Sequence, residues 1–190
     1  MYKTSISKEE INELPLMEWD GEIIEVVTPH GARRAFELLA GERVVGFDTE
    51  TRPSYTKGVV HTPALLQVST LTQAFIFRLK FYPLPPELID FLESATTLKV
   101  GVGIQDDIHG LNKIAKFKPK GFVDLTKEAK LQGCQEGSLR ALTAIYLGTR
   151  LSKAAKLTNW ERHDLTPQQL SYAAIDAAVG LMIYHKLFPS

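Results

Sequence analysis

The stretch Arg43-Val-Val-Gly-Phe-Asp48-Thr-Glu50 decides how the rest of the sequence is interpreted. Its β-branched and aromatic residues predict a short buried strand that ends on two carboxylates. Because side chains alternate along a strand, Asp48 and Glu50 point to one face and Thr49 points to the other. Two anions this close repel each other, and no cationic residue lies beside them on the strand. A hard divalent cation such as Mg²⁺ is the natural partner; two separately solvated acids at a strand end are the alternative.

Length and composition indicate a single globular domain. The 190 residues suffice for a sizeable core, and 44% apolar with 23% charged residues excludes a disordered chain. Basic and acidic residues balance at 22 each, which argues mildly against a dedicated nucleic-acid binder but not against an enzyme that contacts a few phosphates. The single cysteine, Cys134, excludes an internal disulfide and a cysteine-rich zinc site.

No apolar run is long enough to span a membrane, and the first residues do not resemble a signal peptide. We therefore expect no membrane partner and a reducing, cytoplasmic location. The pair Gly101-Val-Gly103 after a predicted strand lacks the third glycine of a dinucleotide-binding loop, since Asp106 holds that place. No nucleotide cofactor is expected.

The order of predicted elements indicates an α/β fold, with one mixed β-sheet flanked by helices in residues 21–190 and an N-terminal extension in residues 1–20. A three-strand antiparallel meander is joined by parallel strands. The predicted strands are 22–27, 43–50, 64–69, 74–77, 98–103 and 122–125. Helices are predicted at 7–14, from Pro29, and at about 86–94, 105–116, 126–132, 137–147 and 166–187.

Helical phase adds further acids to the candidate site. In the helix after Gly103, Asp107 lies on the flank of the apolar face while Asp106 points to water. In the last helix, which is apolar nearly all round, Tyr172 and Asp176 lie one turn apart on one face. A buried carboxylate needs a partner or a metal. The alternatives are a helix N-terminal role for Asp107 and a core hydrogen bond between Tyr172 and Asp176.

Taken together, three segments resemble the motifs of the DEDDy 3′–5′ exonucleases of the ribonuclease-H-like superfamily, the group of the Werner-syndrome helicase exonuclease domain and ribonuclease D. These segments are Phe47-Asp-Thr-Glu50, Val102-Gly-Ile-Gln-Asp-Asp107 and Tyr172-Ala-Ala-Ile-Asp176. The stretch Thr158-Asn-Trp160 is also typical of that group. The histidine-bearing branch would place histidine where Ser171 stands. Asp106 is the alternative to Asp107 in the second motif.

The resemblance implies a ribonuclease-H-like fold and two ions, Mg²⁺ or Mn²⁺, bound by Asp48, Glu50, Asp107 and Asp176. Asp48 would bridge both ions, Glu50 and Asp176 would bind the ion on the side of the nucleophile, and Asp107 would hold the second ion through water. Tyr172 would orient the attacking water. The expected products are nucleoside 5′-monophosphates.

The expected substrate is nucleic acid with a free 3′ end, with DNA favoured over RNA. Candidate substrate-binding residues are Thr49, Lys153 and Trp160, although Trp160 also suits a core position. Three further basic residues of the same region are weaker candidates for phosphate contacts: Arg150, Lys156 and Arg162. A non-catalytic nucleic-acid-binding or scaffold domain of the same fold is the alternative function.

Overall fold

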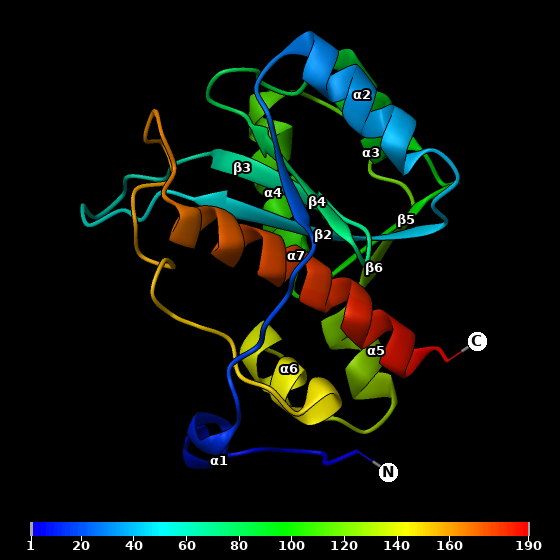
Figure 1. Cartoon of the computed structure of the whole chain (residues 1–190), viewed down its shortest axis with the longest axis vertical. Coiled ribbons are helices and arrows are strands. Elements are labelled where there is room, and N and C mark those ends of the chain that lie inside the picture. Colours follow the sequence, from blue (N-terminus) through cyan, green and yellow to red (C-terminus); the bar gives the residue numbers. More distant parts are fainter. Residues whose placement is uncertain (1, 190) are drawn as a thin grey trace.

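A six-stranded mixed sheet forms the centre of the part of the chain that the structure describes, residues 2–189 of a computed structural model (Figure 1). Across the sheet the strand order is β1-β4-β3-β2-β5-β6. The strands, in chain order, are β1 (Glu22–Val26), β2 (Val44–Thr51), β3 (Pro63–Ser69), β4 (Gln73–Arg78), β5 (Leu98–Gly101) and β6 (Phe122–Asp124).

The strand directions confirm the predicted sheet. β2, β3 and β4 form an antiparallel meander, and β1, β5 and β6 add to it as parallel neighbours of β4, β2 and β5. Because β2 and β5 are parallel, their carboxyl ends lie at the same edge of the sheet. The acids near the end of β2 and the acids that follow β5 are thereby brought to one place.

Helices cover both faces of the sheet (Figure 1). Buried apolar side chains join α2, α3 and α4 to one face, while α7 lies along the other and packs against α5 and α6. The helices are α1 (Lys8–Glu13), α2 (Pro29–Leu39), α3 (Pro86–Glu93), α4 (Gln105–Ile114), α5 (Leu125–Leu131), α6 (Leu139–Leu147) and α7 (Pro167–Leu187). None of the described helices is long and apolar enough to cross a membrane.

Helix α7 approaches β2 so closely that only glycine fits between them. A Cβ atom on Gly46 would lie 2.0 Å from the carbonyl oxygen of Ala177. The helix presents alanines to the sheet, among them Ala173 and Ala174, which pack against β3 and β4. Small residues on both sides therefore bring the helix down onto the strand beside the acids.

The start of α7 is fixed by a reciprocal cap. The Thr166 hydroxyl accepts from the backbone N–H of Gln169, and the Gln169 side chain accepts from the backbone N–H of Thr166. The Gln169 amide also donates to the Thr158 hydroxyl at 2.8 Å. This cap ties the loop before α7 to its first turn, which sets the position of Tyr172 one turn later.

The N-terminal segment packs along the rest of the chain. Ile11 of α1 contacts Ala141 and Ala144 of α6, and the backbone around Leu16 pairs with Arg150, whose carbonyl accepts from Met17 N–H at 2.8 Å. In Figure 1 this segment, in dark blue, passes over α7. The division into an extension (1–20) and a domain (21–190) stays a prediction.

Candidate metal centre

Three carboxylates converge where β2 ends against α7. Asp48 and Glu50 are on β2 and Asp176 is on α7, and each offers an oxygen such that all three oxygens lie within 4.8 Å of one another. Asp176 is 8% exposed, and the other two are half-buried. The alternation predicted for the strand thus places two of its acids on the face that α7 covers.

This grouping makes the negative charges costly. Burial and the charge of Asp176, followed by those of Asp107 and Glu50, raise the pKa of Asp48 well above its usual range. Burial and the charges of Asp176 and Asp107 raise the pKa of Glu50 to about 9. Burial raises the pKa of Asp176 to about 7. Around neutral pH, the site therefore favours protons or a cation.

The donor set fits Mg²⁺ or Mn²⁺. All three side chains offer hard carboxylate oxygens, which are the ligands that these ions prefer. A divalent ion would remove the same repulsion that raises the three pKa values. Asp48, Glu50 and Asp176 are thus the residues that would hold the ion.

Asp107 reaches the site from the opposite face of the sheet. It lies in the first turn of α4 and is half-buried, whereas Asp106 is exposed, as the helical phase predicts. Asp107 stands outside the three-carboxylate group, but its charge contributes to the raised pKa values of Asp48 and Glu50. Thr49 points away from the two acids of β2, Asp48 and Glu50, and donates its hydroxyl proton to Asp107.

Thr49 was predicted to bind substrate. Its hydroxyl proton is committed to Asp107, so in this structure Thr49 orients an acid of the site. Only the lone pairs of the hydroxyl and the backbone remain for a contact with substrate.

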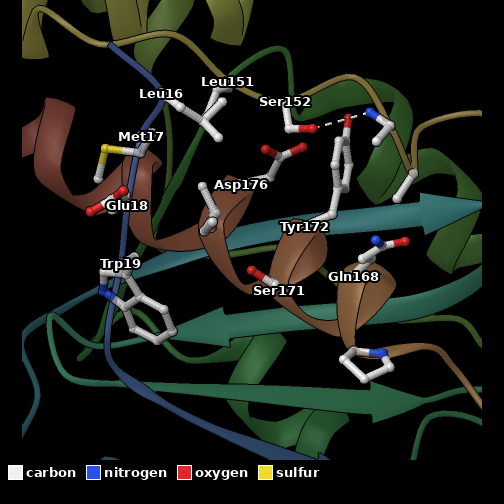
Figure 2. A pocket seen from close by; sticks show the side chains of 14 residues that line it. Leu16, Met17, Glu18, Trp19, Leu151, Ser152, Gln168, Ser171, Tyr172 and Asp176 are labelled. Atoms are coloured by element: carbon white, nitrogen blue, oxygen red, sulfur yellow. Dashed lines mark hydrogen bonds between the residues drawn. The ribbon is translucent and has the colours of Figure 1, made fainter.

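Tyr172 stands one turn before Asp176, and both side chains point to the same side of α7 (Figure 2). Burial and the nearby carboxylates, Asp176 first, raise the pKa of Tyr172 far above its usual value. The phenol is therefore protonated under ordinary conditions. It can donate a hydrogen bond, and it is a poor general base.

Trp160 occupies the core position that the sequence also allowed, and its ring is not exposed for stacking on substrate. The side chain is 1% exposed and packs in the core under α7, with its ring 5.9 Å from that of Tyr172. Its faces are covered by protein and cannot receive a base. Trp160 instead packs against Tyr172 within the core.

Of the basic residues before α7, Lys156 is the one whose charge acts on the acids. Its charge lowers the pKa values of Glu50 and Asp176, although other causes raise both overall. Lys153, the residue that the sequence favoured for phosphate contact, is exposed and has no such effect. Nothing in the spacing of the lysines distinguishes the two, because the loop follows neither helical nor strand periodicity.

A cavity of about 520 Å³ adjoins the acids (Figure 2). Tyr172 and Asp176 line it from α7, Ser152 lines it from the loop before α7, and the N-terminal segment closes one side. The residues that this segment contributes are Leu16, Met17, Glu18 and Trp19. Sequence reasoning missed this wall because no local pattern links residues so far apart in the chain.

Known proteins match both the sequence and the fold. A family model described as 3′-5′ exonuclease matches residues 23–190. The mouse bifunctional 3′-5′ exonuclease/ATP-dependent helicase WRN is 33% identical over 184 residues, covering 92% of this chain and 13% of that protein. An Arabidopsis thaliana 3′-5′ exonuclease is 31% identical over 189 residues, covering 91% and 66%. The chain thus spans only part of these relatives.

The fold is that of solved nucleases. The crystal structure of Trypanosoma brucei RNase D in complex with RNA U12 superposes with a TM-score of 0.79 at 18% identity. The match covers 90% of this chain and 63% of that one. At this identity, the likeness concerns the fold, which is the predicted ribonuclease-H-like one.

Proposed function

This chain belongs to the 3′-5′ exonuclease family, and we propose that it removes nucleotides one at a time from a free 3′ end of nucleic acid, using two Mg²⁺ or Mn²⁺ ions. The observation that carries the proposal is the convergence of Asp48, Glu50 and Asp176, with Asp107 beside them. A non-catalytic domain would have no need to hold three carboxylates together, with a fourth beside them, at this energetic cost.

The acids divide naturally into two groups for holding ions. Asp48, Glu50 and Asp176 offer their oxygens together, whereas Asp107 approaches from α4 and is held by Thr49. Asp48, Glu50 and Asp176 would hold one ion, and Asp48 and Asp107 would hold the second. Two such ions would supply an activated water and charge stabilisation for the leaving 3′-oxygen.

Tyr172 and Lys156 complete the site. The protonated phenol of Tyr172 points to the same side of α7 as Asp176, which suits it to hold the attacking water by a hydrogen bond. Lys156 is exposed at the rim and close enough to the acids to influence their pKa values. A cation there suits a phosphate of the substrate. Lys153 remains a second candidate for such a contact.

The loop that follows β2 suits a single-stranded end. Tyr55 is 84% exposed and its hydroxyl donates to the carbonyl of Leu157, itself 68% exposed, at 3.5 Å. These apolar side chains come from the two loops that flank the acids, with Lys57 in the first of them. Exposed aromatic rings with nearby cations are the pattern that binds unpaired bases without sequence preference.

The assay uses 5′-labelled oligonucleotides as single-stranded DNA, as DNA with a recessed 3′ end and as RNA. Each is incubated with Mg²⁺, Mn²⁺ or EDTA, alongside Asp48→Asn. We expect a metal-dependent ladder that shortens from the 3′ end, nucleoside 5′-monophosphate as product, and no ladder from the variant. DNA should be cleaved faster than RNA, and the RNA arm tests this directly because T. brucei RNase D was crystallised with RNA.

Oligonucleotide binding without cleavage under any metal would overturn the proposal and favour the scaffold function. A fragment released from within the strand would indicate an endonuclease instead.

A further inference from the structure

Gln67 is a buried polar residue that the proposed chemistry does not use. It lies in the middle of β3 and is 0% exposed. Neither its amide nitrogen nor its amide oxygen has a hydrogen-bond partner among the described residues. An unpaired buried amide costs on the order of 1–3 kcal/mol, so a buried glutamine normally has a partner.

The sheet register places Gln67 next to Asp48. The two residues are directly opposite in the antiparallel pairing of β2 and β3, so their side chains project from the same face. The other neighbours of Gln67 on that face include Ile76 opposite it on β4, Leu65 two residues before it on β3 and Ser69 two residues after it. The alanines of α7 cover this part of the face. Asp48 is therefore the acid directly opposite Gln67 in the sheet.

We propose that Gln67 is a positioning residue for the metal centre, whose amide N–H donates to one carboxylate oxygen of Asp48 and so directs the other oxygen to the ion. The proposal rests on the metal centre of the proposed function. Hydrogen bonds of this kind orient a metal-binding carboxylate, and their loss typically weakens metal binding by about 10- to 100-fold. A neutral amide provides the donor without adding a further charge to a site already crowded with carboxylates.

Ser69 provides a matched control. It lies two residues after Gln67 on the same face, is 0% exposed, and has a hydroxyl without a partner among the described residues. It pairs with Gly46 instead of an acid. A role that comes merely from being a buried polar group under α7 would be shared by both residues, whereas a role in orienting Asp48 belongs to Gln67 alone.

The test is Mn²⁺ binding, measured by titration calorimetry on wild type, Gln67→Met, Gln67→Asn, Ser69→Ala and Asp48→Asn. Gln67→Met keeps the length and apolar volume of the side chain, while Gln67→Asn keeps the amide but draws it back by one methylene. We expect both to bind Mn²⁺ about 10- to 100-fold more weakly than wild type, and Ser69→Ala to match wild type. Melting in EDTA reports separately on folding, and we expect Gln67→Met to melt no lower than wild type.

Two outcomes overturn the inference alone: wild-type Mn²⁺ affinity in Gln67→Met and Gln67→Asn, or an equal loss in Ser69→Ala. If one of the Gln67 variants fails to fold, the other decides. Failure of the proposed function looks different, because wild type itself would then not bind Mn²⁺, or Asp48→Asn would bind it equally well. That result would remove both the metal centre and the role of Gln67.

Discussion

The two faces of the central sheet are built from different kinds of side chain. The face under α2, α3 and α4 is filled by large apolar residues, including Phe47, Val68 and Phe77. On the face under α7, the same strands present Asp48, Gln67 and other polar groups beneath a helix lined with alanine. Burial of apolar side chains on one face stabilises the folded state, whereas burial of charged groups on the other face destabilises it. Stability and chemistry are therefore separable by mutation in this molecule.

The largest effect should come from removing a charge from the polar face. Asp176→Asn is expected to reduce exonuclease activity on the order of 10³-fold, because an ion ligand contributes several kcal/mol of charge stabilisation. In EDTA the same variant should melt at a higher temperature than wild type, since burial disfavours the ionised form of Asp176. Asp106→Asn, an exposed acid close to the site, is the control and should change neither. A lower melting temperature for Asp176→Asn in EDTA would show that this carboxylate supports the fold.

Truncating a side chain on the apolar face should lower stability and leave metal binding unchanged. Leu88 of α3 is fully buried in the core of that face. Leu88→Ala is expected to reduce the free energy of unfolding by about 2–5 kcal/mol, measured by urea denaturation. The affinity of the folded variant for Mn²⁺ should stay at the wild-type value. A change in metal affinity as large as that in stability would mean that the faces are not independent.

The pH dependence of the free energy of unfolding should report on the acids of the face under α7 without any mutation. In the metal-free protein the folded-state pKa values of Glu50 and Asp176, about 9 and about 7, lie above their ordinary values. Between pH 5 and 9 the folded state therefore binds more protons than the unfolded state, and stability falls as pH rises. Each group that is protonated only in the folded state contributes a slope of about 1.4 kcal/mol per pH unit. Saturating Mn²⁺ should flatten the melting temperature across this range, and a flat profile in EDTA would contradict the raised pKa values.

The smallest effect should distinguish two exposed lysines. Lys156→Ala removes the cation that lowers the pKa values of Glu50 and Asp176. We expect it to raise KM for the oligonucleotide on the order of fivefold, as suits a surface charge contact of about 1 kcal/mol, and the effect should shrink with added salt. Lys153→Ala should change KM less. Equal effects of the two variants would mean that both lysines act only through nonspecific electrostatic attraction of the nucleic acid.

The features predictable from sequence are those that follow a local period. Alternation along 43–50 correctly separates Asp48 and Glu50 from Thr49, and helical phase correctly separates half-buried Asp107 from exposed Asp106. For Trp160 the sequence left stacking and a core position open, because an aromatic residue between basic ones has the same pattern whether it stacks on a base or fills a core. The place of Gln67 beside Asp48 depends on the register between two strands, which neither segment reveals on its own.

The family match begins at residue 23, but the packing of the molecule does not. Residues Pro15 and Met17 supply two backbone partners to Arg150, and α1 covers an apolar side of α6. A fragment that starts at residue 21 would leave the loop before α7 untethered at one end and would open the cavity next to Asp176 on the side of Leu16–Trp19. The stretch that the family model matches is thus shorter than the stretch that packs together in the structure. Recombinant versions for crystallisation or assay should therefore retain α1 and begin before Lys8.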